Sequence, residues 1–204
     1  DVLNGDAGND SISGNSGNDV FNGGTGADTA VFLSGATVAV NLSLTTAQVT
    51  GEGTDTFVSI ENVTSGAGND TITGSSAANA IQTGDGHDLV FAGAGNDTVD
   101  GGAGNDTLDG GAGGDVLTGG TGTDTVTYAS ATSAVRADMT TSSGNTGFAA
   151  GDSYNSIENL IGSSYADVLI GSTANNALYG GTGDDSLTGK AGNDRLYGGV
   201  GNDE

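Results

Sequence analysis

Residues 83–127 form five consecutive windows of nine residues, which read TGDGHDLVF, AGAGNDTVD, GGAGNDTLD, GGAGGDVLT and GGTGTDTVT. Each window has glycine at its second and fourth positions, aspartate at its sixth and an aliphatic residue at its eighth. A glycine-rich chain with a net charge of −23 could be a disordered linker. A disordered segment does not need an apolar residue at every ninth position, because it packs no core. The period therefore predicts a repeat protein instead.

Windows of the same kind continue on both sides of this stretch. They form three blocks separated by two segments that break the period, the blocks being 1–31, 65–127 and 162–204 and the segments 32–64 and 128–161. We call these segments the first and second insertions. They are related, because TFVSIENV at 56–63 matches SYNSIENL at 153–160. The chain begins and ends inside a repeat, so we expect it to be a fragment of a longer protein.

Composition excludes several classes of protein. The chain of 204 residues has no cysteine, which excludes disulfides and thiolate metal sites. Only three basic residues are present, too few to neutralise a nucleic-acid backbone. No apolar run approaches the roughly 20 residues of a membrane span, and no signal peptide is visible. The large negative charge requires cations as partners.

The nine-residue period predicts an all-β fold. The last three residues of each window form a short strand whose middle side chain points inward, and the preceding six form a turn that glycine permits. Two windows make one coil of a right-handed parallel β-roll, with strands about 4.8 Å apart in each of two sheets. Alternating apolar residues at 38–42 and 135–139 predict strands within the insertions, so we expect the sheets to continue through them.

Turns that are 18 residues apart then stack on the same edge of the roll, which places aspartates opposite each other. Asp106, for example, lies between Asp88 and Asp124. Such carboxylates repel unless a cation lies between them. A hard divalent ion with six to eight oxygen ligands fits flexible turns rich in carbonyls, and Mg²⁺ suits them less because it prefers strict octahedral geometry. The pattern therefore favours Ca²⁺.

At these residues the chain resembles the RTX, or haemolysin-type, calcium-binding repeat family. The resemblance implies that each ion takes the carbonyls of positions two and four and the aspartate of one turn. It adds the carbonyls of positions one and three and the aspartate of the turn 18 residues later. The implied carboxylates are Asp10, Asp19, Asp28, Asp70, Asp88, Asp97, Asp106, Asp115, Asp124, Asp167, Asp185, Asp194 and Asp203. The implied carbonyls are those of Gly8, Gly23, Thr25, Gly66, Gly68, Gly84, Gly86, Gly93, Gly95, Gly101, Gly102, Ala103, Gly104, Gly110, Ala112, Gly119, Thr121, Gly181, Gly183 and Gly198.

Some windows depart from the pattern. Asn79 and Asn176 replace the aspartate with a neutral ligand, which predicts a weak or empty site, and Tyr165 replaces the fourth-position glycine of the Asp167 turn. Asp28 ends its block and is expected to serve one ion only. Ten pairs of Asp or Asn lie 18 residues apart, which sets the expected content at about eight to ten Ca²⁺.

Few other residues suggest chemistry. His87, at a variable fifth position, is expected to be an exposed loop residue rather than a catalytic base. Glu61 and Glu158 could bind metal or a partner, but hydrogen bonding at the end of a strand is the preferred interpretation. Tyr179 and Tyr197, which lie 18 residues apart, could stack on the outer surface or offer a sugar platform. We find no catalytic constellation and expect no enzyme activity from this chain.

The resemblance implies a structural module of a secreted bacterial protein, located outside the cell or at its surface. Such a module would fold on binding extracellular Ca²⁺ and be exported by type I secretion machinery. The alternative is a calcium-dependent polysaccharide-binding module of an extracellular enzyme such as an alginate epimerase, or part of an adhesin or surface-layer protein. Three basic residues make a poor groove for an acidic polysaccharide, which favours the first interpretation.

Overall fold

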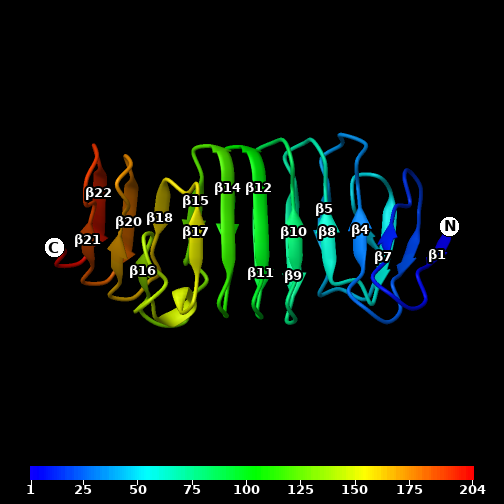
Figure 1. Ribbon diagram of the computed structural model, residues 1–204, viewed down its shortest axis with the longest axis horizontal. Helices are drawn as coiled ribbons and strands as arrows, with labels where there is room; N and C mark the ends of the chain where they lie inside the picture. Colours follow the sequence, from blue (N-terminus) through cyan, green and yellow to red (C-terminus); the bar gives the residue numbers. More distant parts are fainter.

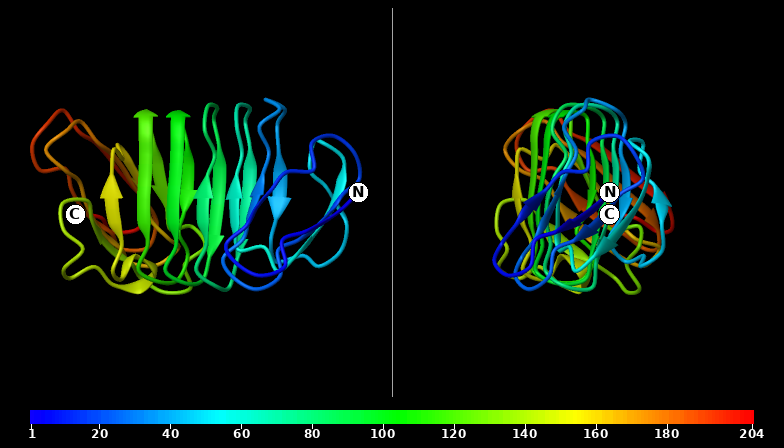
Figure 2. Two further views of the ribbon diagram at one scale, coloured as in Figure 1. Left: turned by 45° about the vertical axis from the view of Figure 1, so that its right-hand side comes forward. Right: turned by 90° about the vertical axis from the view of Figure 1, so that its right-hand side faces the viewer.

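The computed structural model describes all residues 1–204 and is built from 22 short strands and a single 3₁₀ turn, η1 (Gly147–Ala149). Within the repeat blocks, successive strands alternate between two sides of an elongated stack, and the two termini lie at its opposite ends (Figure 1). Seen along the stack, the coils superimpose as a flattened ring (Figure 2). The predicted all-β fold, a parallel β-roll, is confirmed.

The first side of the roll holds, in spatial order, the parallel strands β1 (Val2–Asn4), β3 (Val20–Asn22) and β7 (Thr54–Val58), then β5 (Ala39–Asn41), β9 (Thr71–Ser75), β11 (Leu89–Gly93), β13 (Thr107–Asp109), β15 (Thr125–Thr127), β18 (Asn159–Ile161), β20 (Ala177–Thr182) and β22 (Arg195–Val200). The second side holds β2 (Ser11–Ile12), β4 (Thr29–Val31), β8 (Asn62–Thr64), β10 (Ala80–Gln82), β12 (Thr98–Gly104), β14 (Val116–Gly122) and β17 (Ser153–Asn155), then β16 (Arg136–Asp138), β19 (Val168–Ile170) and β21 (Ser186–Thr188). Only β6 (Gln48–Val49) pairs antiparallel, with β7.

Strand pairing within the blocks follows the predicted register of two windows per coil. Thr98 on β12 pairs with Val116 on β14, and Leu89 on β11 pairs with Thr107 on β13. The register sends the eighth-position side chains into the thin space between the two sides. All five of those in the 83–127 stretch are completely buried, namely Val90, Val99, Leu108, Leu117 and Val126.

Each insertion continues the sheets and adds one strand to a single side. The first insertion leads from β4 to β8, both on the second side, and places β5 and β7 on the first side. The second leads from β15 to β18, both on the first side, and places β16 and β17 on the second. The predicted strands at 38–42 and 135–139 are confirmed as β5 and β16. The two extra strands therefore lie on opposite sides of the roll.

The insertions also bring the bulky side chains into the core. Phe21, Phe32 and Phe57 pack together with ring centroids 5.1 to 6.1 Å apart beside the first insertion. Tyr128 is fully buried at the second. None of the elements is a helix with the length and apolar character needed to cross a membrane.

Candidate metal centre

The sixth-position aspartates form one row along each edge of the roll. Most of these aspartates accept, at Oδ1, a hydrogen bond from the backbone N–H of the sixth residue of the preceding turn on their edge, whereas Asp70 and Asp167 accept from Val38 and Val135 of the insertions. Asp88 N–H donates to Asp106 Oδ1 at 2.9 Å, and Asp106 N–H donates to Asp124 Oδ1 at 2.8 Å. The same bond links Asp70 to Asp88 and Asp97 to Asp115. The predicted juxtaposition of aspartates 18 residues apart is thus present, and we call these rows the carboxylate ladders.

The second oxygen of these carboxylates is buried and has no hydrogen-bond partner. This holds for Oδ2 of Asp10, Asp19, Asp28, Asp70, Asp88, Asp97, Asp106, Asp115, Asp124 and Asp185. A buried polar atom without a partner costs roughly 1–3 kcal/mol, and more when it is charged. A repeated arrangement of this kind is stable only if a group outside the chain satisfies the oxygens.

The glycines at positions two and four bring the backbones of stacked turns into close contact. Gly84 and Gly86 have φ angles of +92° and +154°, a region that side chains with a Cβ rarely adopt. A Cβ on Gly86 would lie 1.8 Å from the carbonyl oxygen of Gly68 in the preceding turn. Carbonyls of one turn are therefore aimed at the next, along the same edge as the aspartates.

These carbonyls retain capacity for a further partner. Gly84 O accepts a hydrogen bond from Ala103 N–H, and Ala103 O accepts one from Gly86 N–H, both at 2.7 Å. A carbonyl oxygen has two lone pairs, so each can accept a second interaction. No three or more Asp, Glu, His or Cys side chains converge on one point as a metal site. A cation between two turns must therefore combine paired carboxylates with backbone carbonyls.

Burial raises the pKa of six ladder carboxylates, those of Asp70, Asp97, Asp106, Asp115, Asp124 and Asp185. It raises the pKa of Asp106 to about 6 and that of Asp115 to about 7, outweighing the N–H donors that Asp88 and Asp97 provide. Neighbouring carboxylates add to both shifts. The cause is loss of hydration around an anion, which a bound divalent cation would reverse. Paired anionic oxygens, free carbonyl lone pairs and flexible glycine turns together fit Ca²⁺.

The insertions supply ladder carboxylates that the sequence interpretation missed. Asp19 N–H donates to Asp55 Oδ1, and Asp115 N–H donates to Asp152 Oδ1, at 2.8 and 2.9 Å. Glu61 accepts from Asp28 N–H in the same way. The ladder therefore continues beyond Asp28, because Glu61 occupies the next position, while the expectation that Asp28 serves one ion only stays a prediction.

Glu158 repeats this arrangement by accepting from Asp124 N–H at 2.8 Å. The preferred interpretation of Glu61 and Glu158, hydrogen bonding at the end of a strand, agrees with these contacts. Asp55 and Asp152 each lie next to the start of a strand, like the repeat aspartates. That position, together with the SIEN repeat, was the signal in the sequence that could have found Asp55 and Asp152 as well.

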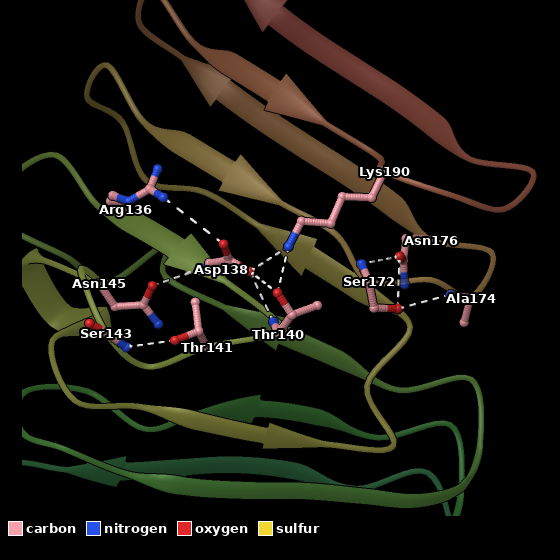
Figure 3. A network of polar contacts seen from close by, with 10 residues as sticks. All are labelled: Arg136, Asp138, Thr140, Thr141, Ser143, Asn145, Ser172, Ala174, Asn176 and Lys190. Carbon is pink, nitrogen blue, oxygen red and sulfur yellow. Dashed lines mark hydrogen bonds and ion pairs between the residues drawn. The ribbon is translucent and has the colours of Figure 1, made fainter.

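Three turns do not present a free carboxylate oxygen. Asp167 accepts hydrogen bonds at both oxygens, from Val135 N–H and from Ser163. Asn79 and Asn176 are held by serines in their own turns, as Figure 3 shows for Asn176 and Ser172. The remaining predicted aspartates, Asp194 and Asp203, accept from Asn176 N–H and Asp185 N–H and belong to the ladders.

Two of the three basic side chains are engaged within the protein. Lys190 Nζ lies 2.8 Å from Asp138 Oδ1 and contacts the hydroxyl of Thr140, while Arg136 lies 4.0 Å from the same carboxylate (Figure 3). Burial raises the pKa of the Asp138 carboxyl, but donors from Lys190 and Thr140 outweigh it and leave that pKa below its ordinary value. Little basic surface remains free.

Tyr179 and Tyr197 stack as predicted, with ring centroids 4.7 Å apart and an interplanar angle of 5°. Both rings are partly exposed on the outer surface of the first side. Because each ring covers a face of the other, the pair offers less free aromatic surface than two separate rings would.

A second ladder runs through the fifth positions of the turns. Asn105 Oδ1 accepts from Thr123 N–H at 2.9 Å, and His87 Nδ1 accepts from Asn105 N–H at 2.8 Å. His87 N–H in turn donates to Asn69 Oδ1. His87 is exposed, as predicted, but it also replaces an asparagine in what we call the fifth-position ladder.

Comparison with known proteins agrees with this geometry. The chain matches the family described as RTX calcium-binding nonapeptide repeat (4 copies), at residues 1–30, 64–99, 91–126, 154–187, 161–196 and 170–204. A search of curated proteins gives no match. The family matches extend over all three repeat blocks and over most of the chain.

Proposed function

The chain belongs to the RTX calcium-binding nonapeptide repeat family, and we propose that it is a structural module whose folding is driven by extracellular Ca²⁺. The family is a calcium-binding repeat rather than a catalytic domain. In this proposal, the module supports the fold of a larger secreted bacterial protein. The ligands of each ion are those implied by the resemblance, with sixth-position carboxylates and carbonyls from two stacked turns.

The observation that carries the proposal is the row of buried carboxylate oxygens without partners. Each would be satisfied by a cation between two turns, and the net charge of −23 would be largely neutralised at the same time. Without cations, folding would bury unpaired anions at a spacing set by the coils. Binding that occurs only in the folded state contributes directly to the free energy of folding.

Affinity links this chemistry to a cellular location. Extracellular calcium modules commonly bind with Kd on the order of 10⁻⁴–10⁻³ M, well above resting cytosolic concentrations. A chain with such sites would stay unfolded in the cytosol and fold after export, which suits type I secretion. We therefore propose that the protein is secreted or displayed at the cell surface.

We prefer this structural role to the polysaccharide-binding alternative. An acidic polysaccharide needs exposed basic groups, and Asp138 engages both Lys190 and Arg136. Arg195 alone is left without a salt bridge, on a strongly acidic surface. The stacked Tyr179–Tyr197 pair is the feature that a sugar-binding role would use.

Circular dichroism in excess chelator, followed by calcium titration, tests the proposal. We expect the β signal to be weak in chelator and to return with Ca²⁺ at submillimolar to millimolar concentration, but not with equal Mg²⁺. A chelated sample that keeps its full β signal would refute calcium-driven folding. Sub-micromolar affinity measured by calorimetry would refute the proposed switch between cytosol and exterior.

A further inference from the structure

Three repeat turns have no positive φ angle at either position two or position four, whereas each of the other repeat turns has at least one. They begin at Gly74, Gly162 and Gly171, and they carry Ser75, Ser163 and Ser172 at position two and no glycine at position four. None of these serines has a positive φ. By contrast, Asp6, Asn15 and Lys190, the other non-glycine residues at position two, adopt φ angles of +68°, +56° and +69°. The serine turns therefore do not form the backbone geometry that aims carbonyls at a shared cation.

In each of these turns the serine donates hydrogen bonds to the side-chain oxygen of the sixth residue, as a cation would attract it. Ser75 N–H donates to Asn79 Oδ1 at 2.7 Å, and Ser172 N–H donates to Asn176 Oδ1 at 2.7 Å. Ser163 donates to Asp167 Oδ2 from both its N–H and its hydroxyl, at 2.5 and 2.9 Å. The oxygen that is unpartnered in a regular turn is thus fully used. Asp167 is accordingly missing from the set of buried carboxylates without partners.

In two of these turns the amide nitrogen binds the preceding coil directly. Asn79 Nδ2 donates to the carbonyl oxygen of Glu61 at 2.5 Å, and Asn176 Nδ2 donates to that of Glu158 at 3.0 Å. Each contact joins residues 18 apart, the separation that a calcium ion bridges in a regular pair. An NH₂ group donates a hydrogen bond to a carbonyl oxygen and repels a cation. The amide therefore joins the two turns directly, where a calcium ion would join them in a regular pair.

We propose that the three serine turns are calcium-free clasps, in which serine and asparagine donors replace the metal. This inference rests on the proposed calcium binding of the regular turns. It means that Asn79 and Asn176 are functional replacements rather than degraded ligands, and that Asp167 does not use its carboxylate on calcium. Of the ten pairs of Asp or Asn at 18-residue spacing, three begin at a clasp, so the chain binds about seven ions rather than about ten.

Counting bound ions tests the proposal. Calcium bound per chain is measured by elemental analysis after equilibrium dialysis, on the wild type and on the triple variant Ser75→Gly, Ala77→Gly, Asn79→Asp. This variant restores the regular pattern at 74–79, and it should bind about one more ion than the wild type. The single variant Ser75→Gly, which leaves Asn79 in place, is the matched control and should not gain an ion.

The outcomes separate this inference from the function on which it rests. A wild type that binds about ten ions, or a triple variant with no gain while the wild type binds about seven, would overturn the clasps and leave calcium binding intact. A wild type that binds none would refute the proposed function itself. Stability in saturating Ca²⁺ gives an independent readout, because Asn79→Asp puts a carboxylate oxygen against the Glu61 carbonyl. The Asn79→Asp single variant should unfold at a lower denaturant concentration, and unchanged stability would contradict the clasp.

Discussion

The central block, 65–127, and the two insertions use the same carboxylate ladder but satisfy it differently. In the central block, Asp88 and Asp106 keep a buried oxygen without any partner. At the insertions, the corresponding oxygens of Asp55 and Asp152 accept hydrogen bonds from the hydroxyls of Thr50 and Tyr128. In the proposed function, the central block takes an ion from solution for these oxygens, whereas the insertions carry their own donors.

The difference shows that the insertions are more than interruptions of a repeat. A clasp turn lies one coil after the SIEN segment of each insertion, with Asn79 18 residues after Glu61 and Asn176 18 residues after Glu158. The hydroxyl donors Thr50 and Tyr128, the clasp turns and the buried aromatic side chains all lie in or next to the insertions. In a one-dimensional stack, stability is a sum of local units and nearest-neighbour contacts. Calcium-independent units next to calcium-dependent ones would then give the roll partial structure without metal.

Removing calcium should give the largest contrast between the two regions. In excess chelator, we expect amides of the central block to exchange hydrogen rapidly, because unpaired carboxylates oppose stacking there. Amides around Asp55 and Asp152 should keep measurable protection, since their carboxylates have protein donors. Hydrogen-exchange mass spectrometry with and without Ca²⁺ measures this difference peptide by peptide. Equal exchange in both regions would show that the insertions have no calcium-independent stability.

Substituting one ladder carboxylate in each region should change the dependence on Ca²⁺ differently. Asp106→Asn removes a buried anion without a partner, so it should leave the residual β signal in chelator unchanged or slightly higher. In saturating Ca²⁺ it should lower the free energy of unfolding by about 1–3 kcal/mol, because a charged ligand is lost. Asp152→Asn should lower both the residual β signal in chelator and the free energy of unfolding in Ca²⁺, because the carboxylate accepts from Asp115 N–H and Tyr128. Circular dichroism in chelator and urea denaturation in Ca²⁺ measure the two effects, and the same response from both variants would contradict the difference between the regions.

The regular coils could be predicted from the sequence, but the ladder through the insertions could not. A strict period fixes which residues are neighbours, so the pairing of Asp88 with Asp106 followed from counting alone. The insertion pairs lie at separations of 36 and 33 residues in the first copy and 37 and 34 in the second. These separations depend on how an extra strand is accommodated on one side, which no local pattern encodes.

The clasp turns were only half predicted, for a similar reason. Asn79 and Asn176 were identified as poor calcium ligands because their side chains are neutral. Their role as donors depends on the carbonyls of Glu61 and Glu158 in the preceding coil, and on serines that reorient the turn. Side-chain chemistry alone shows what a residue cannot bind, whereas its neighbours in space show what it binds instead.

Acidity should distinguish the calcium-free roll from the loaded one. Burial raises the pKa of Asp106 to about 6 and of Asp115 to about 7 in the fold, against about 3.9 for an unfolded aspartate. Groups with a raised pKa favour the folded state when protonated, so this stabilisation is present below about pH 4 and is lost as pH rises through 6 to 7. In chelator, the β signal should therefore increase on acidification from pH 7.5 to about 5.

The calcium-loaded protein should show the opposite trend over the same range. Protons compete with Ca²⁺ for the carboxylates, so the calcium midpoint for folding should rise as pH falls from 7.5 to about 5. Circular dichroism titrations at several pH values give both curves. A chelated chain that gains no structure on acidification would mean that burial of unpaired carboxylates is not what prevents its folding.

The smallest effect should come from His87, which lies within the central block but outside its carboxylate ladder. His87→Ala removes the Nδ1 acceptor of Asn105 N–H, and because the site is exposed, water can replace it. We expect a loss of at most about 0.5 kcal/mol in saturating Ca²⁺, with no change in the calcium midpoint. His87→Asn is the matched control, because asparagine is the acceptor at the neighbouring fifth positions, Asn69 and Asn105. It should equal or slightly exceed the wild type in urea denaturation, and a loss as large as that of His87→Ala would show that the fifth-position ladder contributes nothing to the stacking of the turns.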